Sequence, residues 1–273
     1  MNRKHAVWTV AVLAFAVTLI AGSRSMAAEL PGLASQGKLV VGLDDTFAPM
    51  GFRDTAGNLV GFDIDLAKAV GEEMGLEIVF QPVQWSAKEM ELMTRNVDCL
   101  WNGMSRTPDR EANMTLSQDY LNNRMAIMVK KGIEISSLDQ LAQHQIGTQA
   151  GSSGLDMIKK SAVYPQISGN VHEYSTYDEC ILDLKADRIQ VMVVDEVLGK
   201  YKNTNLGGEF EFAPVDFGDD FYVIGFRRDE KDNAANEQLC KAVEAAIKAV
   251  AASGKGKEIS EKWFGANLLL EMK

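Results

Sequence analysis

Histidine and cysteine are scarce in this sequence, which contains three of each among its 273 residues. Cys99, Cys180 and Cys240 are an odd number without close spacing, and their apolar or helical surroundings favour buried free thiols, with one disulfide as the alternative. Beyond the N-terminal segment the histidines are His144 and His172, which share no ligand spacing with the cysteines. We therefore expect no metal site and no cofactor.

Runs of basic residues are absent as well, and the formal net charge is −10. Such a surface repels nucleic acids and anionic lipids, so neither is an expected partner. Hydrophobic residues make up 46% of the chain, and no segment has low complexity. This composition predicts a packed globular core.

A long uncharged run, residues 6–21, lies near the N-terminus between Arg3-Lys4 and a small-residue tail that ends at Ala28. This order is typical of a secretory signal peptide, and the run is short for a membrane span of about 20 apolar residues. We predict a signal peptide at residues 1–28 and a periplasmic location, with an uncleaved anchor as the alternative. Removing its three basic residues changes the net charge to −13.

From residue 38 onward, short apolar strands alternate with amphipathic helices. "KLVVGL" is an expected strand, and "GFDIDLAKAVGEEMG" is an expected helix that stops at Gly75. The same order restarts after "RMAIMVKKG" with the strand "QIGTQ" and, later, "IQVMVV". Strands and helices that alternate in this way predict parallel sheets with right-handed crossovers, here in two similar α/β lobes.

The expected helix at residues 233–256 follows a second lobe that is already complete, so the C-terminal segment is expected to return to the first lobe. Two segments would then cross between the lobes, near residues 121–123 and 218–220. The predicted boundaries are residues 29–121 and 220–273 for lobe 1 and residues 122–219 for lobe 2.

Polar residues collect just beyond the expected strands, where open parallel sheets bind their ligands. Asp195 follows four apolar residues, so its carboxylate is expected low in a cleft and in need of a cation. Thr107 is expected to cap a short helix that Pro108 begins. Arg110, in the first turn of this helix, offers a two-pronged grip to a carboxylate. Either the two pair with each other or with surface charges, or a zwitterionic ligand bridges them.

Two further motifs each have a structural and a functional interpretation. "QAGSSG" supplies glycines and a helix start whose free N–H groups favour an anion, but it is equally a plain helix cap, and it lacks the lysine of a phosphate-binding P-loop. Phe47 and Trp85 lie in polar loops beside strand ends. Each is either a core residue or the wall of a pocket.

The segments "LVVGLDDTFAPMGFRDTAGNLVGFDIDLAKAVGEEMG", "VQW", "VDCLWNGMSRTPDR", "QAGSSG" and "VVDEV", taken in this order, resemble the extracellular solute-binding proteins of family 3. These proteins deliver polar amino acids to ABC transporters. The resemblance spans essentially the whole mature chain. It implies a periplasmic binding protein-like type II fold, in which two α/β lobes are joined by a two-strand hinge.

The resemblance also implies roles for particular residues. Arg110 would grip the α-carboxylate of the ligand, with backbone N–H groups at Ser105 and at Ser152 or Ser153. Asp195, the Gly103 carbonyl and the Ser105 hydroxyl would hold the α-ammonium. The remaining implied contacts are Phe47 and Trp85 as a clamp on the side chain, and Asp44, Asn102 and Tyr177 at the rim.

We therefore expect a monomeric periplasmic protein, without enzymatic activity, that captures an α-amino acid by hinge closure and passes it to an ABC transporter permease. The sequence departs from many relatives at Asn102, Gly103 and Gly154, which leaves the preferred side chain open. One alternative is an enzyme similar to cyclohexadienyl dehydratase, which is built on the same scaffold. Another is a soluble amino-acid receptor for a sensor protein.

Overall fold

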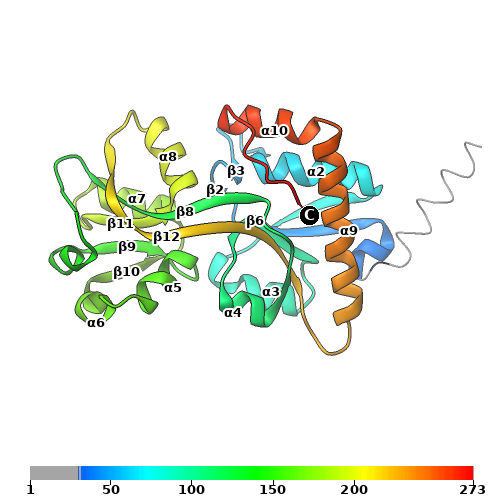
Figure 1. Ribbon diagram of the computed structural model, residues 1–273, viewed down its shortest axis with the longest axis horizontal. Helices are drawn as coiled ribbons and strands as arrows, with labels where there is room; N and C mark the ends of the chain where they lie inside the picture. Colours follow the sequence, from blue (N-terminus) through cyan, green and yellow to red (C-terminus); the bar gives the residue numbers. More distant parts are fainter. Residues whose placement is uncertain (1–29, 31, 273) are drawn as a thin grey trace, which may run out of the picture.

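Two α/β lobes lie side by side in the computed structural model, which describes residue 30 and residues 32–272 (Figure 1). The strands β8 (Leu121–Lys130) and β12 (Phe210–Arg227) run from one lobe into the other and pair antiparallel with each other. They form the two-strand hinge that the sequence predicts. The predicted signal peptide, residues 1–28, lies outside the described residues.

Lobe 1 is built on parallel strands at one end of a mixed sheet whose order is β10-β9-β11-β8-β12-β6-β1-β5. The central strand β1 (Lys38–Leu43) pairs parallel with β5 (Glu77–Pro82) and with β6 (Cys99–Ser105). The other strands are β2 (Thr46–Phe47), β3 (Gly51–Arg53), β4 (Leu59–Val60) and β7 (Met114–Leu116). The helices are η1 (Gly32–Gln36), α2 (Phe62–Met74), η2 (Trp85–Ala87), α3 (Lys88–Met93), α4 (Pro108–Asn113), α9 (Asn233–Ala252) and α10 (Lys255–Phe264).

Lobe 2 repeats this plan at the other end of the sheet. Strand β9 (Ile146–Gln149) pairs parallel with β10 (Val171–Tyr174) and with β11 (Val191–Asp195), and β11 pairs antiparallel with β8. Its helices are η3 (Leu138–Gln143), α5 (Ser153–Lys160), α6 (Tyr164–Ile167), η4 (Ser168–Asn170), α7 (Tyr177–Lys185) and α8 (Glu196–Asn205). A separate apolar core of this lobe joins hinge strand β8 to β9, β11 and α5.

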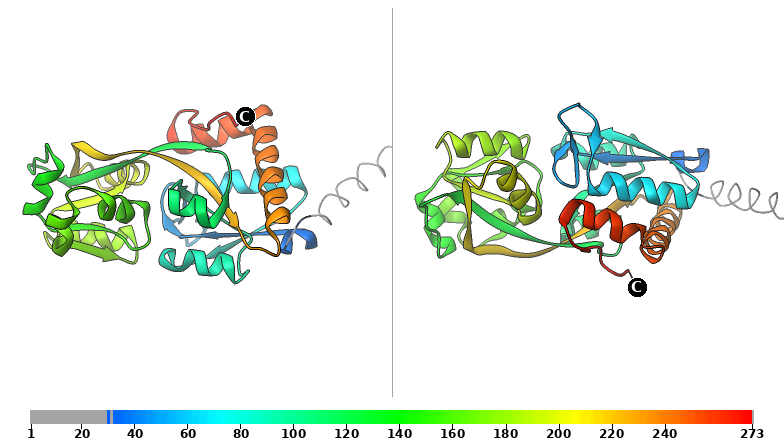
Figure 2. Two further views of the ribbon diagram at one scale, coloured as in Figure 1. Left: turned by 60° about the horizontal axis from the view of Figure 1, so that its bottom comes forward. Right: turned by 90° about the horizontal axis from the view of Figure 1, so that it is seen from above.

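The C-terminal segment returns to lobe 1, as the sequence predicts. Helix α9 packs along α2, and α10 packs on both of these helices (Figure 2). The apolar stripe of α9, which includes Leu239, Val243 and Ile247, is buried in the core. The chain therefore enters lobe 2 along β8 and leaves it along β12.

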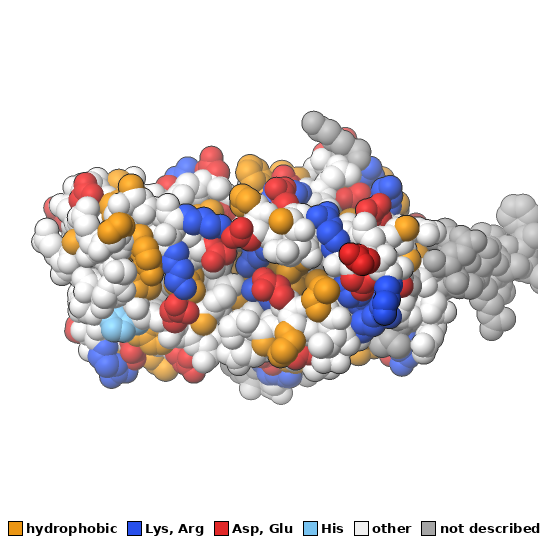
Figure 3. Space-filling model, turned by 90° about the horizontal axis from the view of Figure 1, so that it is seen from below, with side chains coloured by type: hydrophobic (Ala, Val, Ile, Leu, Met, Phe, Trp, Pro, Cys, Tyr) orange, Lys and Arg blue, Asp and Glu red, His pale blue; other side chains and the backbone are white. Residues whose placement is uncertain are grey.

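All three cysteines are buried and free, which agrees with the predicted thiols. Within the described part of the chain, no helix has the length and apolar character needed to cross a membrane. On the face seen from below, acidic and basic side chains alternate and hydrophobic ones form only small patches (Figure 3). The mixture of charges therefore keeps this face well solvated.

Candidate functional site

The ends of the parallel strands of both lobes meet across a closed cleft. Here a cavity of about 10 Å³ remains, which has room for about one water molecule. Every residue predicted for the site except Asp44 and Asn102 lines it, together with one that was not predicted, Gln149. The lining residues are Phe47, Trp85, Gly103, Ser105, Arg110, Gln149, Ser152, Ser153, Tyr177 and Asp195.

Asp44 and Asn102 lie beside this cavity and are linked to each other. The Asn102 Oδ1 accepts a hydrogen bond from the Asp44 backbone N–H at 3.1 Å, while its Nδ2 is buried without a partner among the described residues. Asp44 Oδ2 accepts a hydrogen bond from Gln149 Nε2 of the other lobe at 2.6 Å. Asn102 thus supports the Asp44 loop, and Asp44 reaches across the cleft.

Arg110 owes its position to the start of helix α4. Thr107 caps this helix by accepting a hydrogen bond from the Arg110 backbone N–H at 3.2 Å, and Pro108 occupies the first turn, as predicted. The buried guanidinium donates to the carbonyl oxygens of Ser105 at 2.8 Å and Gly151 at 3.4 Å. Burial lowers the pKa of Arg110 from its ordinary value. Among the described residues, no carboxylate forms an ion pair with it.

Asp195 ends strand β11 and is surrounded by neutral donors. Its carboxylate accepts hydrogen bonds from Asn123 Nδ2 at 2.8 Å, from the Tyr222 hydroxyl at 3.0 Å and from the Tyr177 hydroxyl at 3.3 Å. Burial, and next the charge of Asp220, raises the pKa of Asp195 to about 7. Asp195 and Arg110 do not pair with each other, so each retains an affinity for a group of opposite charge.

Position 103 requires glycine, both for its backbone conformation and for the space around it. Its φ is +56°, and a methyl group in place of its α-hydrogen would lie 2.7 Å from the Phe47 ring. Its N–H donates to the carboxylate of Asp63, at the start of α2, at 2.7 Å. Asp63 also accepts hydrogen bonds from Trp101 and Tyr120, and burial raises its pKa to about 7. Asp63, the first of the two aspartates in "GFDIDLAKAV", therefore fixes the backbone of Gly103, which lines the cavity.

The structural interpretation of "QAGSSG" as a helix cap is confirmed at the start of α5, and its interpretation as an anion site stays a prediction. The Ser152 hydroxyl caps the helix by accepting a hydrogen bond from the Leu155 N–H at 3.1 Å. The next hydroxyl, that of Ser153, lies 2.7 Å from the Ser105 hydroxyl of the other lobe. One serine therefore serves the helix, and its neighbour faces the cleft.

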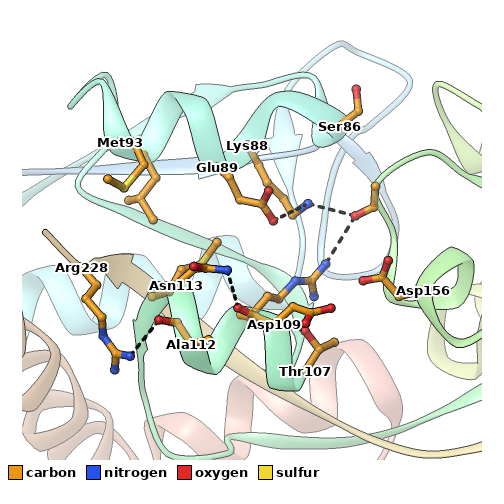
Figure 4. Close-up of a pocket in the computed structure, with 14 residues that line it drawn as sticks. Ser86, Lys88, Glu89, Met93, Thr107, Asp109, Ala112, Asn113, Asp156 and Arg228 are labelled. Carbon is orange, nitrogen blue, oxygen red and sulfur yellow. Dashed lines mark hydrogen bonds and ion pairs between the residues drawn. The ribbon is translucent and has the colours of Figure 1, made fainter. Parts of the chain in front are cut away.

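A buried lysine, Lys88, also joins the lobes at the mouth of the cleft. It donates from Nζ to the carbonyl oxygen of Gly151 at 2.9 Å (Figure 4), which Arg110 also contacts. The same ammonium group lies over the Trp85 ring. Burial, and next the charge of Arg110, lowers the pKa of Lys88 to about 8. A more exposed ion pair, Lys160 with Asp109 at 2.5 Å, crosses between the lobes nearby.

Sequence reasoning missed several residues that shape the site, namely Asp63, Lys88, Asn123, Gln149, Asp220 and Tyr222. Lys88 carried a detectable signal, because it precedes the buried Leu92 by four residues and so shares the inward face of its helix. Asn123 and Asp220 carried a weaker one, since they lie in the predicted crossing segments. Their convergence depends on the pairing of β8 with β12.

Comparison with known proteins gives a consistent picture. Residues 39–266 match the family described as bacterial extracellular solute-binding proteins, family 3. The L-cystine-binding protein TcyJ of Escherichia coli K12 is 29% identical, over 93% of this chain and 94% of that protein.

Two solved structures are also similar. One is an ABC uptake transporter substrate-binding protein from Streptococcus pneumoniae with bound histidine, with a TM-score of 0.79 and 32% identity, covering 87% of this chain and 96% of that one. The other is an ancestral arginine-binding protein bound to arginine, with a TM-score of 0.76 and 32% identity, covering 84% and 99%. The chain belongs to the bacterial extracellular solute-binding proteins of family 3.

Proposed function

We propose that this protein captures an α-amino acid between its lobes in the periplasm and delivers it to the membrane permease of an ABC transporter. The main support is the arrangement of Arg110 and Asp195. These residues have opposite charges, come from different lobes and line one cleft without pairing with each other. A zwitterion presents one carboxylate and one ammonium, so it satisfies both groups only when the lobes are closed around it.

The expected binding free energies support this function. Micromolar affinity requires about 8 kcal/mol. Hydrogen bonds to charged groups contribute about 1.5 to 3 kcal/mol each, and the proposed site offers several of them. Arg110 would grip the carboxylate together with the N–H groups of Ser105 and Ser153. Asp195 and the Ser105 hydroxyl would hold the ammonium, and the costs of closing and ordering the lobes reduce the sum.

The far end of the cleft favours a polar side chain. The centroids of the Phe47 and Tyr177 rings lie 6.0 Å apart, and Trp85 lines the same cavity. These aromatic rings would pack against the side chain of the ligand. At its end, Asp44 and Gln149 bond across the lobes and offer both an acceptor and a donor. The amino acids named for the similar proteins, cystine, histidine and arginine, carry polar or charged ends of this kind.

Hinge motion is part of the proposal. A cavity of about 10 Å³ admits no amino acid, so the lobes must separate before one enters. We place the moving boundaries at residues 121/122 and 219/220, where β8 and β12 cross from lobe to lobe. The permease would read the closed shape, and a monomer suffices for this cycle.

Thermal unfolding with and without L-arginine, L-histidine and L-cystine tests the proposal. At least one of these is expected to raise the Tm of the wild type, while Arg110→Ala and Asp195→Ala abolish the shift. Arg228→Ala and Asp219→Ala are matched controls outside the cavity and should retain it. Wild-type shifts in both cleft variants would refute the assignment of the pocket.

A dehydratase is the second candidate, because Asp195 is a buried acid whose pKa of about 7 suits proton donation to a leaving hydroxyl. Absorbance measured during incubation with prephenate or L-arogenate distinguishes the two functions. We expect no change in the spectrum. Turnover that is lost in Asp195→Asn would establish the enzyme instead.

A further inference from the structure

The two hinge strands carry a carboxylate that the family resemblance does not assign. Asp220 on β12 is the register partner of Asn123 on β8, and both side chains are buried at the base of the cleft. Asp220 Oδ2 accepts hydrogen bonds from Ser105 Oγ at 2.6 Å and from Asn123 Nδ2 at 2.9 Å. Its other oxygen accepts the Phe221 N–H at 2.9 Å. Asp220 is thus one hydrogen bond away from the cavity wall formed by Ser105.

Asp195 and Asp220 share a single amide donor. The Nδ2 of Asn123 lies 2.8 Å from Asp195 Oδ1 and 2.9 Å from Asp220 Oδ2, so the two carboxylates converge on one nitrogen. The other side-chain donors to the pair are hydroxyl groups, those of Ser105, Tyr177 and Tyr222. The pair therefore consists of two buried carboxylates held by neutral groups.

Among the described residues, one cation and two phenols act on this pair of carboxylates. Arg110 on α4 is the cation that acts on both acids, but its guanidinium donates to carbonyl oxygens. Tyr177 on α7 and Tyr222 on β12 face Asp195, and burial raises the pKa of both phenols well above its ordinary value, so they stay neutral. Two carboxylates this close in a buried site do not both ionise readily without a cation between them.

We propose that Asp220 is the second carboxylate of the ammonium site and that an entering primary ammonium group displaces a proton shared by Asp195 and Asp220. This inference rests on the proposed function. No covalent bond of the ligand changes; one O–H bond of a carboxylic acid breaks, and the proton passes to solvent. An ammonium group in the cavity has three N–H donors and one positive charge, so it can contact Asp195 and the Ser105 hydroxyl directly and act on Asp220 through the bond between Ser105 and Asp220.

The sign of the pH effect follows from the charges. Burial raises the pKa of both acids, so the ligand-free pair holds a proton near neutral pH. A bound ammonium favours the ionised form and lowers that pKa. Ligand affinity should therefore rise with pH until the ligand-free pair has lost its proton at about 7. Below that value the rise approaches about tenfold per pH unit, because one proton is released per ligand.

Titration calorimetry tests this inference with L-arginine, whose ionisable groups keep their charges between pH about 5.5 and 8. Measurements at pH about 6 in two buffers with different ionisation enthalpies give the number of protons released. We expect a value close to one for the wild type and a clearly smaller value, with a flatter pH profile, for Asp220→Asn. Asp219→Asn, the exposed neighbour, should behave as the wild type.

The outcomes separate the two proposals. Binding of L-arginine without proton release by the wild type, or equal release by Asp220→Asn, would overturn the shared-proton site and leave the proposed function standing. If L-arginine gives no heat, L-cystine is titrated in its place for the proton count. L-histidine is used only to detect binding, because its imidazole itself titrates near pH about 6. The absence of binding by all three overturns both. Because the absence of proton release by the wild type overturns the shared-proton site without any variant, the test survives if Asp220→Asn fails to fold.

Discussion

Replacing Gly151 by alanine should weaken ligand binding through a steric overlap that exists only when the lobes are closed. Gly151 has φ of +70°, and a methyl group there would lie 2.9 Å from the Ser86 Cα of the other lobe. The contact is with backbone, so it cannot be relieved by turning a side chain. When the lobes are apart the methyl group is free of this overlap.

The alanine at position 151 has two free-energy costs, and only one of them lowers ligand affinity. Alanine at positive φ costs about 1–2 kcal/mol in the folded protein, whether the lobes are open or closed. The overlap with Ser86 adds about 1–3 kcal/mol, the usual cost of overpacking, but only on closure. That second cost corresponds to an affinity about 5- to 150-fold lower.

The matched control is Gly132→Ala, in the same lobe. Gly132 has φ of +88°, and nothing lies within 4 Å of an added methyl group. Denaturant unfolding without ligand should show similar losses of stability for the two variants. Calorimetry with L-arginine, L-histidine or L-cystine should show reduced affinity for Gly151→Ala alone. Equal affinities in the two variants would refute closure through the contact between Gly151 and Ser86.

Two further substitutions test the groups that support the site. Lys88→Met removes the bond to the Gly151 carbonyl and should lower ligand affinity by about 2- to 12-fold, for a net loss of about 0.5–1.5 kcal/mol. The control Lys160→Met, which removes the exposed cross-lobe ion pair, should change ligand affinity by less than about 5-fold. Equal effects of the two substitutions in calorimetry would contradict a special role for Lys88. Asp63→Asn should destabilise the protein by about 1–3 kcal/mol through the lost acceptor of the Gly103 N–H. Because the folded pKa of Asp63 is raised to about 7 from an ordinary 3.8, the folded protein binds more protons than the unfolded chain between these values, so wild-type stability falls as pH rises through that window. Asp63→Asn should show a smaller fall in urea unfolding, and an unchanged pH profile would argue against a protonated Asp63.

The predictions that succeeded rest on local signals. The alternation of strands and helices, the Thr107-Pro108 start of α4 and the glycine stop of α2 are all encoded within a few residues. Placement of Arg110 and Asp195 at the cleft followed from the rule that polar residues beyond parallel strands face the ligand edge. The resemblance to a known family added the expected roles, which remain proposals until ligands are tested.

The residues that escaped prediction are those whose environment depends on distant segments. Asp220 meets Asn123 across 97 positions of sequence, because β8 and β12 pair at the hinge. Lys88 shares the inward face of its helix with Leu92, but the Gly151 carbonyl to which it donates comes from lobe 2. Asn102, predicted at the rim, does not line the cavity in this structure, and its Oδ1 accepts a hydrogen bond from the Asp44 backbone N–H.

The sequence by itself determined that this chain forms two α/β lobes with charged residues at their facing strand ends, since periodicity, caps and strand-end polarity are local properties. Only the tertiary structure decided which of those charges are left without a counter-charge. That depends on how closely the lobes approach and on which groups the hinge strands bring beside them. Burial and the pairing of distant strands, rather than residue type, therefore set the electrostatics of the cleft.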